Sequence, residues 1–173
     1  MRRKNMILDI RSNNGGTTPV KLVSALVKRR TSGFKCLDTR QKTIEERMRF
    51  AWLHKGKKEQ GYVIDPSSYN PAKRPYKGNI FVLVNQSTVS AAEDFAFPLK
   101  KSRRAKLIGI KTKGSNGNSL PYVFGKKIMF CVGVTQVRFP DGSRFEGVGI
   151  KPDIEVYPSI DDIRTENDRT HKN

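Results

Sequence analysis

The stretch IFVLVNQSTVSAAED, residues 80–94, carries the strongest structural signal in the chain. It opens on five consecutive apolar residues, Ile80 to Val84, a pattern typical of a strand that is covered on both faces. A polar turn follows, and a helix is expected from about Val89 to Phe97, where Pro98 should kink or end it. A buried strand that leads directly into a helix is the repeating unit of an α/β sheet.

Strand and helix patterns of the same kind extend in both directions from this stretch. A helix with Thr18 as N-cap and Pro19 at its first position is expected over residues 18–29. Strands are expected at residues 6–10, 107–110, 128–137 and 154–156, with weaker candidates at 49–53 and 61–64. The alternation predicts an α/β domain. Because the chain opens almost directly in a buried-type strand, we expect it to be the C-terminal part of a longer domain.

Composition sets broad limits on function. The 173 residues include 34 Lys and Arg against 16 Asp and Glu, a formal net charge of +18. The basic clusters are scattered and have no interleaved aromatic residues, so specific nucleic-acid binding is the weaker interpretation of this charge. Two cysteines and two histidines are too few for a disulfide scaffold or a four-ligand zinc site, and nothing indicates a metal or an organic cofactor. No apolar run approaches the ~18–20 residues of a membrane span.

Ser90 stands where the predicted strand-to-helix turn ends. Backbone N–H groups and the helix dipole favour negative charge at a helix N-terminus, which suits an acyl-transfer nucleophile. The N–H of Ala91 would then be the first oxyanion donor. The alternative is structural, because Ser90 and Glu93 also fit a capping box in which each side chain satisfies an unpaired N–H group.

Three further turns are rich in glycine and follow predicted strands or loops, at residues 9–16, 109–117 and 145–153. Glycine lets backbone N–H groups approach a ligand closely. The first of these turns is therefore either a tight connection or the source of a second oxyanion donor.

The four segments, in this order, resemble the tail-specific (C-terminal processing) protease family, the S41 serine peptidases. The resemblance lies in Leu8–Gly16, Ser90–Glu93, Gly109–Gly117 and Gly147–Asp153, and a further short motif, Pro140–Gly142, precedes the last of them. It covers residues 6–16 and about 79–160, with no usable motif in 31–75. It implies a crotonase/ClpP-like α/β fold of ββα units, incomplete at the N-terminus, with a peptidase domain over 1–160 and a charged tail over 161–173. The implied activity is hydrolysis of peptide bonds in a polypeptide substrate through an acyl-enzyme.

The resemblance also assigns roles to residues. Ser90 would be the nucleophile of a serine-type endopeptidase, with the N–H of Ala91 and of Gly15 or Gly16 as the oxyanion hole. Glu93 and Ser115 would support Ser90. Asn14 stands where the family usually has a glycine, which leaves the choice between Gly15 and Gly16 open.

The general base is where the sequence departs from the processing proteases. They pair serine with a lysine, and that position is occupied here by Ser115. Lys111 and Lys113 are out of register and are expected to be solvated. The chain is therefore expected to lie closer to the tricorn and retinoid-binding-protein-like branch of the family. In that branch a histidine from further upstream acts with a glutamate, here Glu146.

The two histidines of the chain are weak candidates for that base. His54 lies in a basic segment and His171 in the terminal tail. If the base lies in upstream sequence, the chain is expected to be a truncated peptidase that keeps the fold and is inactive alone. The alternative function is a non-catalytic binding module on the same fold, favoured by the absence of a lysine at position 115 and of a convincing histidine. Family members are usually exported, yet residues 6–10 are too short for the apolar region of a signal peptide. No oligomeric state is assigned. Cys131 is expected to pack in a core strand.

Overall fold

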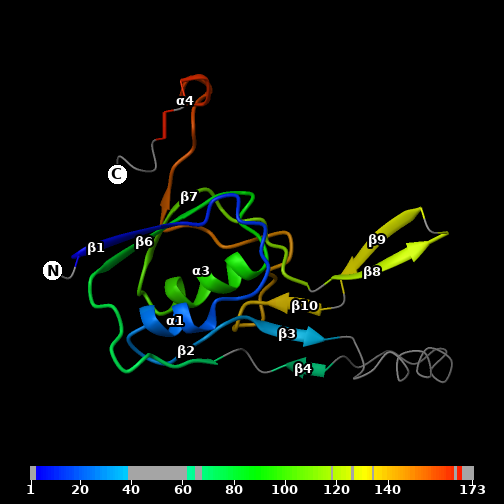
Figure 1. Ribbon diagram of the computed structural model, residues 1–173, viewed down its shortest axis with the longest axis horizontal. Coiled ribbons are helices and arrows are strands. Elements are labelled where there is room, and N and C mark those ends of the chain that lie inside the picture. The colour runs from blue at the N-terminus through cyan, green and yellow to red at the C-terminus, as the bar shows by residue number, and fades with distance from the viewer. Residues whose placement is uncertain are drawn as a thin grey trace.

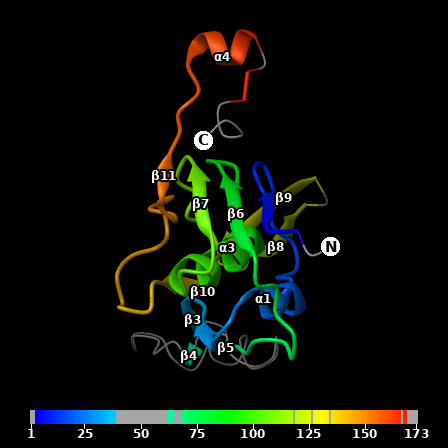
Figure 2. The same cartoon turned by 90° about the vertical axis from the view of Figure 1, so that its left-hand side faces the viewer.

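A parallel four-stranded sheet forms the centre of the molecule (Figures 1 and 2). The computed structural model describes residues 3–38, 62–64, 68–117, 119–125, 127–133, 135–165 and 167–168. The strand order is β1-β6-β7-β11 and every neighbouring pair is parallel. The strands are β1 (Asn5–Asp9), β6 (Asn79–Val84), β7 (Lys106–Gly109) and β11 (Ile154–Glu155). The predicted α/β class and these four strands are confirmed.

Two helices, α1 (Val20–Leu26) and α3 (Ala91–Lys101), share one hydrophobic core with the sheet. Alternate residues of β6 belong to this core, namely Ile80, Val82 and Val84. Successive side chains of a strand point to opposite faces, so these three mark the face that the helices cover. Figure 2 shows α3 behind β6 and β7. The turn between β6 and α3 is thereby fixed at the carboxyl end of the strand.

Both helix ends differ from the sequence prediction. Pro19, not Thr18, precedes α1, and no side chain caps that helix. The Thr18 hydroxyl instead donates to the Asp94 carboxylate at 2.9 Å, a tertiary contact that the local sequence does not encode. Pro98 lies inside α3, which continues to Lys101. Pro98 and Leu99 are both buried, and their packing outweighs the backbone hydrogen bond that proline removes.

Two smaller sheets lie beside the central one. The first has the order β10-β3-β4 and is antiparallel, and the second pairs β2 with β5. Their strands are β10 (Thr135–Arg138), β3 (Lys35–Asp38), β4 (Tyr62–Ile64), β2 (Thr31–Ser32) and β5 (Ser68–Tyr69). The strand predicted at 61–64 is confirmed as β4. The candidate strand at 49–53 lies outside the described residues, as do His54 and His171.

A hairpin of β8 (Ser119–Phe124) and β9 (Ile128–Gly133) projects from the body (Figure 1). The predicted strand 128–137 is therefore two strands, because β9 pairs with β8 whereas β10 pairs with β3. The prediction that Cys131 packs in the core is wrong: all of β9 is exposed. Its apolar neighbours include Phe124, 72% exposed, and Met129, 70% exposed.

The last element is a short helix, α4 (Ile160–Arg164), at the start of the segment predicted as a charged tail over residues 161–173. None of the helices in the described part of the chain combines the length and hydrophobicity that crossing a bilayer requires.

Arg104 joins the end of α1 to the segment that leads into β6. Its side chain is only 9% exposed. Its Nε donates to the carbonyl of Leu26 at 2.7 Å, and Nη2 donates to the carbonyls of Tyr76 and Gly78 at 2.6 and 2.7 Å. One guanidinium therefore satisfies three carbonyl oxygens from two segments.

The variant Arg104→Ala is expected to lower the free energy of unfolding by about 3 kcal/mol, because it leaves these carbonyls without their charged donor. Urea denaturation followed by circular dichroism measures the change. The matched control is Arg103→Ala, at an exposed neighbour, with an expected change within about 0.5 kcal/mol. Equal losses of unfolding free energy in the two variants would contradict this stabilising role of Arg104.

Candidate active site

Ser90 lies at the N-terminus of α3 in a strained backbone conformation. Its φ is +58° and its ψ is −121°, a region that residues other than glycine rarely occupy. Its N–H is shared between the Ser115 carbonyl, at 3.1 Å, and the Glu93 carboxylate, at 3.0 Å. The Glu93 half of the predicted capping box is therefore present. Strain held in place by surrounding hydrogen bonds is common at functional sites.

Glu93 is fully buried and holds the site together. Besides the Ser90 N–H, its carboxylate accepts the Thr112 hydroxyl at 2.5 Å and the N–H groups of Gly114 and Ser115 at 2.8 and 3.1 Å. Four donors compensate the loss of water around a buried carboxylate. The turn that carries Ser90 is thus tied to the segment 112–115.

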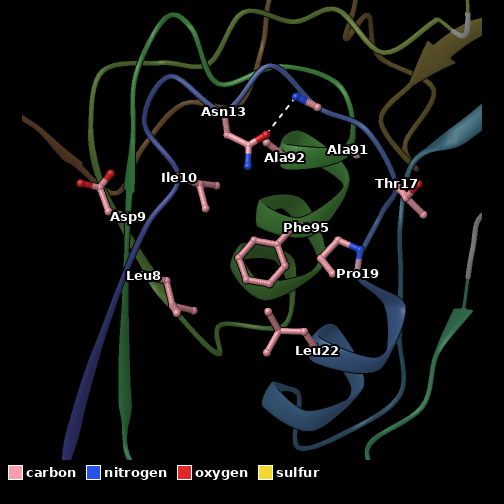
Figure 3. A pocket seen from close by; sticks show the side chains of 11 residues that line it. Leu8, Asp9, Ile10, Asn13, Thr17, Pro19, Leu22, Ala91, Ala92 and Phe95 are labelled. Atoms are coloured by element: carbon pink, nitrogen blue, oxygen red, sulfur yellow. Dashed lines mark hydrogen bonds between the residues drawn. The ribbon is translucent and has the colours of Figure 1, made fainter.

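The first glycine-rich turn lies against Ser90. A Cβ on Gly15 would stand 2.7 Å from Ser90 Cβ and 3.2 Å from its Oγ, whereas one on Gly16 would meet no atom within 4 Å. Of the two predicted donors, Gly15 is therefore the one in contact with Ser90. Its N–H donates to Asn13 Oδ1 at 2.9 Å in this structure (Figure 3). Val89 N–H donates to the Asn13 carbonyl at 3.0 Å and fixes the turn beside the helix.

The segment around Glu146 completes the site. Gly147 N–H donates to the Gly114 carbonyl at 2.7 Å, and Glu146 Oε1 accepts the Asn116 N–H at 3.4 Å. Burial raises the pKa of the Glu146 carboxyl, and the neighbouring charge of Glu93 raises it further. The four segments that the sequence singled out are thus brought together.

Two cavities adjoin Ser90. One, of about 640 Å³, is lined by Asn14, Val89, Ser90, Ser115, Asn116, Gly117, Ser119, Gly133, Thr135 and Glu146. Ser90 and Glu146 therefore face the same space. The other, of about 240 Å³, lies beyond Gly15 and is lined by Ala91 and Ala92, which directly follow Ser90. Figure 3 shows the side chains of Leu22 and Phe95 gathered at this second cavity, which is largely apolar.

The candidates for the general base do not converge on Ser90. Ser115 is exposed and contributes its backbone, accepting the Ser90 N–H and donating to Glu93. Lys111 and Lys113 are exposed, as predicted. The described residues contain no histidine, because His54 and His171 both lie outside them.

A polar link beside Ser90 is not predicted by the sequence. Asn116 Oδ1 lies 3.4 Å from Ser90 Oγ, and Asn116 Nδ2 donates to Asp94 Oδ1 at 2.6 Å. Burial raises the pKa of the Asp94 carboxyl, although its hydrogen bonds with Asn116 and Thr18 oppose the shift. No local pattern pairs residues 94 and 116, and only the fold brings them together.

The site thus places a serine with strained backbone at the N-terminus of a helix, beside a glycine-rich turn. Residues 1–156 match peptidase family S41. A Staphylococcus aureus protein named "Probable CtpA-like serine protease" is 29% identical over 159 residues, which cover 88% of this chain and 27% of that protein. This chain thus spans about a quarter of the relative's length.

Two solved structures share the fold. The photosystem II D1 C-terminal processing protease has a TM-score of 0.60 and 26% identity, with 91% of this chain and 36% of that one covered. Mature CPAF complexed with lactacystin has a TM-score of 0.72 and 20% identity, with 94% and 41% covered. The chain belongs to peptidase family S41. Two predictions stay predictions: that the chain lies closer to the tricorn and retinoid-binding-protein-like branch of the family, and that its peptidase domain ends at residue 160.

The variant Glu93→Gln tests the role of the buried carboxylate. An amide has only one oxygen to offer four donors and its NH₂ faces some of them, so we expect a loss of about 2–4 kcal/mol in unfolding free energy. Chemical denaturation measures it. Glu155→Gln, at an exposed glutamate paired with Lys151, is the control and should change little. A Glu93→Gln protein as stable as the control would refute this role.

Proposed function

We propose that this chain supplies the nucleophile and the oxyanion hole of a serine peptidase of the tail-specific type. The observation that carries the proposal is Ser90 itself: a strained serine at a helix N-terminus, in contact with Gly15 and facing a cavity with Glu146. Its substrate is a polypeptide. We propose that the fold is of the crotonase/ClpP-like class. We also propose an exported location, because members of the family are usually exported.

The chemistry is acyl transfer in two steps. Ser90 Oγ attacks the carbonyl carbon of the scissile peptide, its proton passes to a general base, and the base returns the proton to the leaving amine. Water then attacks the ester, with a proton again passing through the base, and releases Ser90. The base is proposed to come from outside the described residues, and Glu146 to orient it.

Two backbone N–H groups are proposed to stabilise the oxyanion. Ala91 is the first residue of α3, so its N–H has no acceptor within the helix. The second donor comes from Gly15 or Gly16. Gly15 is closer to Ser90, but Asn13 Oδ1 must release its N–H before it can serve.

The 240 Å³ cavity is proposed to hold a substrate side chain. It is lined by the residues that follow Ser90 and by the apolar side chains of Leu22 and Phe95. A cavity of this kind favours an apolar side chain next to the scissile bond.

The alternative function, a binding module without catalysis, is favoured by Ser115 at the position of the family's lysine. A single test separates the two functions. An alkyl fluorophosphonate, whose chain suits the apolar cavity, is expected to add to the folded protein at Ser90, as intact mass and peptide mapping would show. Ser90→Ala should abolish the addition and Ser87→Ala, at an exposed serine of the preceding turn, should retain it. A folded wild-type protein without label would contradict an activated Ser90 in this chain alone, and would leave the binding module or a peptidase that lacks its base.

The pair Gly15→Ala and Gly16→Ala tests the first turn. Both glycines have positive φ, +100° and +121°, so both variants carry backbone strain. Only the Gly15 variant adds a Cβ that collides with Ser90. We expect it to react with the fluorophosphonate roughly 10–100-fold more slowly than Gly16→Ala, since displacing a nucleophile by about 1 Å has effects of this order. Equal rates would show that Gly15 does not set the position of Ser90.

A further inference from the structure

Asn116 connects Ser90 to two carboxylates at once. Its Oδ1 lies 3.4 Å from Ser90 Oγ, its Nδ2 donates to Asp94 Oδ1 at 2.6 Å, and its backbone N–H donates to Glu146 Oε1 at 3.4 Å. Asp94 is held in turn, because its Oδ2 accepts the Thr18 hydroxyl at 2.9 Å. The side chain of Asn116 is thus fixed at both ends.

These contacts settle which way the amide of Asn116 points. The Asp94 carboxylate accepts hydrogen bonds on both oxygens, from Thr18 and from Asn116, so the amide nitrogen must face Asp94. The amide oxygen therefore faces Ser90. An amide oxygen only accepts hydrogen bonds, so the Ser90 hydroxyl is the donor in this contact.

We propose that Asn116 is a positioning residue that aims the Ser90 hydroxyl, and that Asp94 fixes the orientation of Asn116. The proposal rests on Ser90 acting as the nucleophile. In the resting site, donation of the single hydroxyl proton to Asn116 fixes the position of Ser90 Oγ, and this proton turns to the general base when the attack begins. An amide does not take up the proton at neutral pH, so Asn116 is not the general base.

The link also ties the two sides of the site together. Thr18 follows the turn that contains Gly15 and Gly16, whereas Asn116 belongs to the segment next to Glu146. The path Thr18–Asp94–Asn116–Ser90 therefore keeps the turn with the oxyanion donors in register with the hydroxyl.

The first experiment measures the rate of fluorophosphonate addition to Ser90 across pH. Asn116→Ala and Asp94→Asn are each expected to slow the reaction about tenfold, as the loss of one hydrogen bond implies. The carboxylates that face this region are Asp94, Glu93 and Glu146, and Asn116 does not titrate. The midpoint of the pH profile should therefore stay unchanged in Asn116→Ala, whereas removal of a general base would abolish the titration.

The matched control is Asn79→Ala. Asn79 is exposed, and its amide likewise donates to a side chain, Asn5 Oδ1 at 2.9 Å, at the start of β6. The Asn79→Ala protein should react with the fluorophosphonate at the same rate as the wild type. If Asn116→Ala reacts as fast as Asn79→Ala, the proposal is overturned.

A second experiment does not depend on catalysis. In a Ser90→Cys protein, alkylation by iodoacetamide across pH, mapped to residue 90 by mass spectrometry, gives the pKa of the thiol. An acceptor such as the Asn116 oxygen favours the protonated thiol, so Asn116→Ala in this background should shift the thiol pKa downward. An unshifted pKa would overturn the proposal. If wild-type Ser90 fails to react but the thiol pKa shifts, the contact with Asn116 is upheld and the proposed catalytic function is what fails.

Discussion

The buried carboxylate of Glu93 is the interaction on which the candidate site depends. It collects donors from Ser90, Thr112, Gly114 and Ser115, and Thr112 Oγ1 also accepts the Ile150 N–H at 2.8 Å. Three chain segments distant in sequence are therefore held around one charge. A buried carboxylate is stable only while its donors remain in place, so the arrangement of these segments is coupled to the position of Ser90.

The two interpretations of Ser90 that the sequence leaves open prove compatible. Glu93 accepts the Ser90 N–H as a capping residue does, and the Ser90 side chain turns toward Asn116. The cap therefore restrains the backbone and leaves the hydroxyl available to the cavity. One four-residue motif can serve helix stability and chemistry because the two functions use different atoms.

Much of the fold could be predicted because its strongest signals are local. The apolar run Ile80–Val84 and the polar turn after it encode β6 and the start of α3 without help from other segments. The end of α3 and the place of Cys131 could not be predicted because packing decides them: the helix continues past a buried proline to Lys101, and the strand with Cys131 belongs to an exposed hairpin. The glycine-rich turn left the contact of Gly15 with Ser90 open, and the family resemblance favoured it, whereas the pairing of Asp94 with Asn116 depends on the fold alone.

The β8–β9 hairpin has a consequence for how the protein behaves in concentrated solution. It exposes aromatic and aliphatic side chains on a strand pair, a surface that promotes association between copies. The net charge of +18 opposes such encounters by long-range repulsion. Salt shortens the reach of that repulsion from about 10 Å at 0.1 M to about 3 Å at 1 M ionic strength. Colloidal stability should therefore decline as ionic strength rises, and purification is best carried out in dilute buffer.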